Sequence, residues 1–282
     1  MRALAPDVVD VIWESVQDLI PVPVDSHPLG CHRRRVPDRI CLTGILYRLV
    51  TGASWQTVEH LLGGQVSDTT LRARRDEWVN AGVFTHLFDQ ALAAYDRIIG
   101  LDLTEVSIDG SNHTAACGGD GTGSNPANRG KTGWKWSIAT DKTGVPIGWA
   151  IDAANRHDSK LVLPTLSAIA RRGLLPDIET VHLDKGYDYR FVRELLTGAG
   201  IEPAIIKRKP RGQARPPAPY QIHHRWVVER TNSWLNNFGQ LRRNTDRRPT
   251  HRNAQLALAT TILIITKLIT WRDRHHPPIP IR

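Results

Sequence analysis

The sequence predicts an α/β domain that follows an all-helical N-terminal region. Over the first hundred residues the apolar residues recur at helical spacing, whereas from Leu101 onward short apolar runs typical of strands alternate with helical patterns. A chain of 282 residues, 40% of them apolar, has enough core-forming material for one large or two ordinary domains. We therefore predict a helical region over residues 1–100 and an α/β domain over residues 101–282.

Two short predicted helices in the first region are joined by a Gly-containing turn. The first begins after Ser54, a typical N-cap, and ends at a Gly-Gly pair. The second carries Arg72, Arg74 and Arg75, which a helix-turn-helix would present to DNA. An ordinary helical subdomain with a solvated charged face is the alternative interpretation.

In the second region, two predicted strands each end in an aspartate. The run LTEVSIDG ends at Asp109 and the run IETVHLD ends at Asp184, and a glycine follows each within two residues. Strand ends are where an α/β sheet presents functional side chains, although aspartate before glycine is also ordinary turn chemistry. Between them, WKWSIATD and GVPIGWAID predict an antiparallel hairpin.

The surplus of positive charge is concentrated near one glutamate. The chain has 37 Lys and Arg against 28 Asp and Glu, a net charge of +9. Residues 207–248 alone contain eleven of the basic residues and only two acids, Glu229 and Asp246, so the rest of the chain is balanced at 26 against 26. A polyanion is the natural partner of such a stretch, because each cation that neutralises a phosphate releases counterions.

Glu229 lies on a predicted cationic helix, one turn after Arg225, with Trp226, Trp234 and Leu235 predicted to face inward. A surface pair with Arg225 would contribute at most ~0.5 kcal/mol, which is a weak reason for an acid there. Two strand-end aspartates and this glutamate could instead converge on two hard cations such as Mg²⁺ or Mn²⁺. Such a pair of metals activates a water or a 3′-hydroxyl and stabilises the leaving oxygen at phosphorus.

Four blocks together resemble the DDE transposases of bacterial insertion sequences, in the group called insertion sequence family five. They are SIDGS, GKTGWKWSIATDKTGVPIGWAIDAANRHDS, HLDKGYD and RWVVERTNSWL, and the resemblance covers roughly residues 36–272. It implies an RNase H-like mixed-sheet catalytic core after the helical DNA-binding region. It also implies Mg²⁺ dependence with Mn²⁺ as a substitute, cleavage at element ends and strand transfer into target DNA.

The same resemblance implies the partners and the setting. The first partner is double-stranded DNA, which serves both as terminal inverted repeats and as target. The second partner is another copy of the chain, since two element ends are handled together. The expected location is the bacterial cytoplasm, at the nucleoid, with no membrane partner.

Carried over position by position, the resemblance implies that Asp109, Asp184 and Glu229 are the catalytic, metal-binding carboxylates. In the broader superfamily this glutamate belongs to a Tyr-x2-Arg-x3-Glu-x6-Lys signature. Arg225 and Glu229 match it.

Two positions depart from that signature. Ile222 stands where the tyrosine would be, and Asn236 stands where the lysine would be. Arg230, Arg242 and Arg243 are therefore the candidates to hold the phosphate of the element end.

The Gly/Asn-rich loop before the hairpin offers further cations. Its GSNPANRGKT run is similar to a phosphate-binding P-loop, but Asn125 stands where a glycine is required and a strand follows, so we reject an NTPase. Arg129 and Lys131 are predicted to grip the DNA backbone, and a merely solvated loop is the alternative. The complete predicted DNA-binding set is Arg72, Arg74, Arg75, Arg129, Lys131, Lys207, Arg208, Lys209, Arg225, Arg230, Arg242 and Arg243.

Other features set the protein class. Cys31, Cys41 and Cys117 form no CxxC pair, which fits a reducing compartment. The N-terminus contains acids where a signal peptide needs a basic and then an apolar run. The longest uncharged apolar segment, residues 253–266, is too short to span a bilayer. We therefore expect a soluble intracellular protein.

Two rival functions remain open at this point. A non-catalytic DNA-binding protein would keep the basic surface without the metal chemistry. A domesticated metal-dependent nuclease would cut DNA without strand transfer.

Overall fold

The computed structural model describes residues 3–22, 35–205 and 221–276. The chain divides into two compact units. The first contains the chain up to residue 93 together with residues 237–244 and 250 onward, and the second contains residues 94–236 and 245–249. The contacts thus group the C-terminal helix with the N-terminal helices, whereas the predicted functional division at residue 100 stays a prediction.

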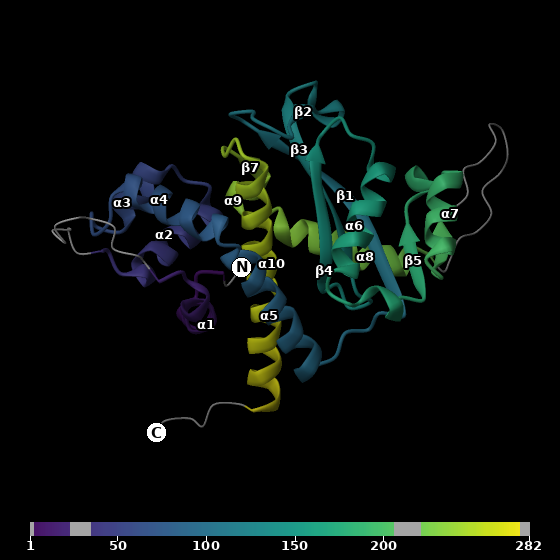
Figure 1. Ribbon diagram of the computed structural model, residues 1–282, viewed down its shortest axis with the longest axis horizontal. Coiled ribbons are helices and arrows are strands. Elements are labelled where there is room, and N and C mark those ends of the chain that lie inside the picture. The colour runs from purple at the N-terminus through teal and green to yellow at the C-terminus, as the bar shows by residue number, and fades with distance from the viewer. Residues whose placement is uncertain (1–2, 23–34, 206–220, 277–282) are drawn as a thin grey trace. The chain divides into compact units, whose positions relative to one another are not determined.

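The first unit is built almost entirely from helices (Figure 1). Its elements are α1 (Pro6–Val16), the 3-10 turn η1 (Gln17–Leu19), α2 (Asp38–Thr51), α3 (Trp55–Leu61), α4 (Asp68–Asn80), α5 (Val83–Ile98), which continues into the second unit, α9 (Gly239–Arg242), the two-residue strand β7 (Arg243–Asn244) and α10 (Pro249–His275).

The predicted pair of short helices is confirmed as α3 and α4. The Ser54 side chain accepts a hydrogen bond from the Thr57 amide, and Ser67 caps α4 in the same way through the Thr70 amide. These caps satisfy amides that have no partner within the helix. Helices α2, α3 and α4 pack against one another, with Leu71 buried among them.

Helix α10 is long and apolar enough to cross a membrane by length and composition. However, 67% of its most apolar window is buried inside the protein. A core helix meets the same test, because it too must be apolar on nearly every side.

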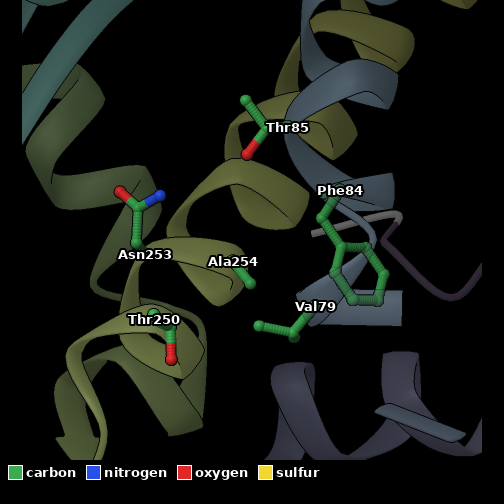
Figure 2. A pocket seen from close by; sticks show the side chains of 7 residues that line it. Val79, Phe84, Thr85, Thr250, Asn253 and Ala254 are labelled. Atoms are coloured by element: carbon green, nitrogen blue, oxygen red, sulfur yellow. The ribbon is translucent and has the colours of Figure 1, made fainter. Parts of the chain in front are cut away.

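A small pocket of about 120 Å³ lies beside the first turns of α10 (Figure 2), lined by Val79, Gly82, Phe84, Thr85, Thr250, Asn253 and Ala254.

The second unit is a mixed sheet with helices on its faces (Figure 1). Its strands are β1 (Glu105–Ala115), β2 (Gly123–Ser124), β3 (Thr132–Thr140), β4 (Pro146–Ala153), β5 (Thr180–Leu183) and β6 (Glu202–Ile205). Its helices are α6 (Val162–Ala170), α7 (Arg190–Gly198) and α8 (Gln221–Leu235), with 3-10 turns η2 (Pro126–Asn128), η3 (Asp158–Leu161), η4 (Leu175–Asp177) and η5 (Lys185–Tyr187).

The order of strands across the sheet defines the fold. It runs β4-β3-β1-β5-β6, with the short β2 also paired to β3. The first three of these pair antiparallel, as the predicted hairpin required, while β5 runs parallel to β1 and β6 parallel to β5. If these five strands are numbered 1 to 5 in sequence order, their order across the sheet is 3-2-1-4-5. This is the RNase H-like arrangement.

Strand β1 differs from its prediction. The sequence predicts that β1 ends at Asp109 and Gly110, but the strand continues to Ala115. The continuation pairs antiparallel with β3 as far as Thr114 opposite Gly133, and this pairing satisfies backbone groups that a turn would leave to solvent. Asp109 therefore lies in the middle of β1, at the level where the neighbouring β5 ends.

The two faces of the sheet are covered by different helices. On β3, Ser137 hydrogen-bonds Thr165 of α6, whereas its neighbour Trp136 hydrogen-bonds Asn232 of α8. Successive residues of a strand point to opposite faces, so α6 and α8 cover opposite sides. Asp109 lies on the α8 side, because it also bonds Asn232.

The close packing of α6 on β4 can be tested at Gly148. A Cβ there would lie 2.8 Å from Ile169 Cγ1 and 3.2 Å from the Ile169 amide nitrogen. We expect Gly148→Ala to lower the free energy of unfolding by about 1–3 kcal/mol, because the overpacked contact forces the helix to shift.

The control is Gly198→Ala in the last turn of α7, where a Cβ would meet nothing within 4 Å. That variant should be neutral or stabilised by up to about 1 kcal/mol. Urea unfolding of the wild type and both variants measures the difference. Equal stability of the two variants would contradict the packing.

Candidate active site

Two aspartates lie side by side on the α8 face of the sheet. Strands β1 and β5 pair with Ser107 opposite His182. Two residues further along, the same register brings Asp109 opposite Asp184, which directly follows β5 and precedes η5. An interval of two residues returns to the same face, so both carboxylates face α8.

Helix α8 supplies the third carboxylate and is fixed to the hairpin turn. The Thr231 hydroxyl donates to the Gly144 carbonyl at 2.8 Å, and Arg230 Nη2 donates to the Thr143 carbonyl at 2.7 Å. Glu229, one residue earlier on this helix, is exposed. These bonds set the rotation of the helix about its own axis, and therefore the direction in which Glu229 points.

Arg225 links two of the three carboxylates. Its Nη1 donates to Asp184 Oδ1 at 3.3 Å, and its Nη2 donates to Glu229 Oε1 at 3.0 Å. Its charge also lowers the pKa of Asp109, while Glu229 raises it, so all three carboxylates lie within electrostatic reach of one guanidinium. The sequence-predicted pair of Arg225 and Glu229 is therefore part of a larger cluster.

Burial changes the protonation of Asp109. The pKa of its carboxyl is raised from 3.8 to about 6, and the main cause is desolvation, which disfavours the charged form. The Gly110 amide, the Arg225 charge and the Asn232 side chain each lower the pKa but do not offset the burial. The site therefore holds a carboxylate that is costly to charge even with the Arg225 guanidinium nearby.

Asn232 and Trp136 were not among the predicted site residues, but hydrogen bonds link both of them to Asp109. Asn232 Nδ2 donates to Asp109 Oδ2 at 3.1 Å, and Asn232 Oδ1 accepts from Trp136 Nε1 at 2.8 Å. One sequence signal could have pointed to Asn232 as a site residue. It lies three residues after Glu229, on nearly the same face of the helix.

Tyr187 is a third residue that was not among the predicted site residues. Its hydroxyl is buried and has no hydrogen-bond partner among the described residues. Burial raises its pKa well above the usual value, and the charges of Asp158, Asp109 and Asp184 raise it further. The phenol therefore stays protonated as a donor beside the acidic cluster.

The donor set suits the divalent metal that the fold family implies. Carboxylate oxygens are the ligands that Mg²⁺ and Mn²⁺ prefer, and a cation would relieve the cost of charging the buried Asp109. Within the described ranges, no three Asp, Glu, His or Cys side chains lie together as a ready-made metal site. Arg225 lies between two of the carboxylates, since it pairs with both Asp184 and Glu229.

Helix α4 does not present its arginines as predicted. Arg74 is 5% exposed and pairs with Asp38 and Glu77, and Arg75 is 9% exposed beside Asp76. The prediction that the helix offers all three cations to DNA is corrected, because helix packing turns two of them inward. Arg72 is exposed and pairs with Asp68, so its contact with DNA stays a prediction.

The remaining predicted cations lie in several places. Arg129 and Lys131 are exposed on the loop before β3. Arg242 and Arg243 are exposed and belong to the helical unit. Lys207, Arg208 and Lys209 lie outside the described residues. Their contacts with DNA stay predictions.

Arg230 is held between two indoles of its own helix. Its guanidinium lies 4.5 Å from the Trp226 ring centroid and 4.8 Å from that of Trp234. Trp226, predicted to face inward, is instead 56% exposed. The reason is the rotation of α8, which directs Val228, Thr231 and Leu235 to the sheet and leaves Trp226 outside.

The cost of the Asp109 charge can be measured directly. We expect Asp109→Asn to raise the free energy of unfolding by about 1–3 kcal/mol at pH 8 in EDTA, because a shift of one pKa unit corresponds to about 1.4 kcal/mol. Since the folded pKa is raised, the stability linked to Asp109 is complete below pH 3.8 and is lost as the pH rises to about 6.

The gain from Asp109→Asn should therefore shrink toward zero at pH 4, when thermal or urea unfolding is compared with wild type at the same pH. A variant that is less stable than wild type at pH 8 would contradict the proposed charging cost.

The sequence matches known transposases over most of its length. Residues 96–265, which include all three carboxylates, match the family described as "Transposase DDE domain", and residues 8–88 match "Putative transposase of IS4/5 family". The chain is 37% identical over 150 residues to "Putative transposase for insertion sequence element IS402" of Burkholderia cepacia, covering 50% of this chain and 67% of the relative. It is also 31% identical over 121 residues to "Insertion element IS402 uncharacterized 16.2 kDa protein" of the same organism, covering 43% and 82% respectively.

Among solved structures, the chain is similar to the pre-cleavage Mos1 transpososome, with 12% identity, a TM-score of 0.28 and coverage of 88% of this chain and 82% of that one. It is also similar to the Mos1 mariner paired end complex with Mn, with 10% identity, a TM-score of 0.27 and coverage of 92% and 85%. The RNase H-like fold rests on the strand order given above. On its sequence matches, the chain belongs to the DDE transposases of bacterial insertion sequences.

Proposed function

We propose that this transposase cleaves the ends of an insertion sequence and joins the freed 3′-hydroxyls to target DNA, with Asp109, Asp184 and Glu229 as its catalytic carboxylates. The observation that supports this is the cluster itself. In a unit with RNase H-like strand order, one guanidinium bonds a carboxylate at the end of β5 and one on α8, and its charge lowers the pKa of a third carboxylate on β1. Mg²⁺ is the proposed cofactor, and Mn²⁺ should substitute for it.

Both proposed reactions exchange one bond at phosphorus for another. In cleavage, a water oxygen bonds to phosphorus, the bond from phosphorus to the 3′-oxygen breaks, and that oxygen leaves as a hydroxyl. In joining, this 3′-hydroxyl bonds to a target phosphorus and a target 3′-oxygen leaves. Two divalent metals, when bound, activate the attacking oxygen and stabilise the leaving one.

The residues of the chain have separate proposed tasks. Asp109 on β1 and Asp184 directly after β5 form a rigid pair of oxygen donors, and Glu229 completes the set from α8. Arg225, which lies beside them, is proposed to bind the phosphate of the element end, because guanidinium matches phosphate geometry as well as carboxylate geometry. The basic stretch of residues 207–248 is proposed to hold the flanking DNA backbone.

The proposed assembly is a homodimer on double-stranded DNA, since two element ends must be joined to one target. We expect the protein to act in the bacterial cytoplasm, where both DNA substrates are found.

The first test is strand cleavage of labelled DNA that carries the end of the element encoding this chain. Wild type should produce a 3′-hydroxyl end with Mg²⁺ or Mn²⁺ and none with EDTA. Asp184→Asn should lose cleavage by at least about 10³-fold, because a lost ligand removes the metal's electrostatic stabilisation, while DNA binding at the same salt is retained.

The matched control is Asp177→Asn, the same change at an exposed aspartate of the second unit, which should cleave like wild type. Equal binding with no cleavage by any of these proteins would favour the non-catalytic DNA-binding protein. Cleavage without joining to a target would favour the nuclease.

Arg225 provides an independent prediction. Arg225→Gln removes the cation that bonds Asp184 and Glu229, so Mn²⁺ should bind several-fold more tightly in the absence of DNA. The same variant should bind the element end more weakly, because a phosphate partner is lost. Mn²⁺ titration and DNA-binding curves at two salt concentrations measure the two effects. If both affinities fall together, the guanidinium does not compete with metal at this site.

A further inference from the structure

A buried chain of hydrogen bonds leads from the sheet to the Asp109 carboxylate through α8. Trp136 Nε1 donates to Asn232 Oδ1 at 2.8 Å, and Asn232 Nδ2 donates to Asp109 Oδ2 at 3.1 Å. Trp136 is fully buried and Asn232 is 6% exposed. The chain joins residues of β3, α8 and β1, which come together only in the folded unit.

The chemistry of the indole fixes the orientation of the amide. The Trp136 N–H is only a donor, so it must face the oxygen of Asn232 and not its NH₂ group. This leaves the NH₂ group toward Asp109, whose ionised carboxylate only accepts. The reversed amide would place donor against donor and acceptor against acceptor, and would leave buried polar groups without partners.

The indole itself has little freedom to move. The His113 ring stacks on Trp136 with 3.5 Å between ring centroids, and Trp134 packs edge-on at 5.4 Å. Both neighbours are buried. The orientation of the Asn232 amide is therefore set by a rigid aromatic cluster behind it.

We propose that Asn232 is a positioning residue for metal binding, which holds the Asp109 carboxylate in one rotamer through an amide whose orientation Trp136 fixes. This inference rests on the proposed function of Asp109 as a metal ligand. The Asn232 amide is not itself a ligand, because its oxygen is occupied by the indole and its nitrogen has no free lone pair to offer.

A neutral donor suits this task better than a cationic one. Arg225 neutralises the carboxylates that it bonds and so competes with a metal for them. Asn232 restricts Asp109 through a hydrogen bond but leaves its full negative charge to attract a cation. Partners that orient a ligand in this way contribute about 10–100-fold to metal affinity in other proteins.

If Asn232 had a purely structural role, it would only hold α8 against the sheet. Thr231 and Arg230 already fix the helix to the hairpin turn at the neighbouring positions. Removal of Asn232 should therefore leave the fold in place and affect the metal site, which gives the two roles different outcomes.

The experiment measures Mn²⁺ affinity of the full chain without DNA, by calorimetry or by the spin-resonance signal of free Mn²⁺. Asn232→Ala should weaken binding about tenfold or more, and raised Mn²⁺ should restore DNA cleavage, as a positional defect predicts. Trp136→Phe keeps an aromatic ring in the core but replaces the indole with a smaller phenyl ring that has no N–H, and it should weaken Mn²⁺ binding less and in the same direction.

When Trp136→Phe is combined with Asn232→Ala, it should cause almost no further loss of Mn²⁺ affinity, because the two residues act through one amide. The control is Ser233→Ala, an exposed neighbour on the same helix whose hydroxyl donates to the Glu229 carbonyl, and it should bind Mn²⁺ like wild type. Circular dichroism and thermal unfolding in EDTA confirm that each variant is folded.

Mn²⁺ binding within twofold of wild type by Asn232→Ala, while Asp109→Asn loses it, would overturn the positioning role and leave the proposed function standing. If Asn232→Ala does not fold, Trp136→Phe decides alone, and unchanged Mn²⁺ affinity in that variant would overturn the proposal. If Asp109→Asn binds Mn²⁺ as wild type does, the proposed function itself fails.

Discussion

The half-buried carboxylate of Asp109 is the constraint on which the second unit depends. A charge removed from water in this way is costly unless hydrogen bonds or an opposite charge compensate for it. Here the compensation comes from three different elements, since the Gly110 amide belongs to β1 while Asn232 and Arg225 belong to α8. The pKa nevertheless remains raised, to about 6. A stable sheet alone would not need a carboxylate there, which is consistent with the catalytic role proposed for Asp109.

Arg225 is the cation that links two of the carboxylates. Its two bonds join a strand-end carboxylate to a helix carboxylate, and its side chain is 23% exposed at one end of the cluster. A guanidinium so close to solvent can turn away at modest cost, because exposed ion pairs contribute only about 0–1 kcal/mol each. We infer that the same side chain can serve the carboxylates in one state and a DNA phosphate in another.

Sequence periodicity was sufficient for the parts of the fold that depend on local patterns. The hairpin of β3 and β4 was predicted because both strands have period-two patterns on either side of a turn that ends in Gly144. The two aspartates were selected as candidates because each follows an apolar run. The length of β1 was underestimated, because Asp109-Gly110 also reads as a turn, and only pairing with β3 shows that the strand continues.

Tertiary contacts account for what the sequence did not predict. The spacing of Arg74 and Arg75 gives their place on a helix but not which side of that helix is packed. Asn232 could not be identified, because its partner Trp136 is 96 residues away and no local pattern joins them. Trp226 was misplaced for the same reason, since the rotation of α8 is set by its bonds to a distant turn.

The contacts of α8 also imply an order of assembly. Strands β1, β3 and β4 are close in sequence and can pair early, whereas α8 reaches the hairpin turn across 87 residues and Asp109 across 123. Such long-range contacts form late in folding, because loop closure must be compensated first. During synthesis on the ribosome, a growing chain would therefore have its sheet before it had a complete set of carboxylates. A chain that stopped before α8 would leave Trp136 uncovered on one face of that sheet, and would be prone to aggregate.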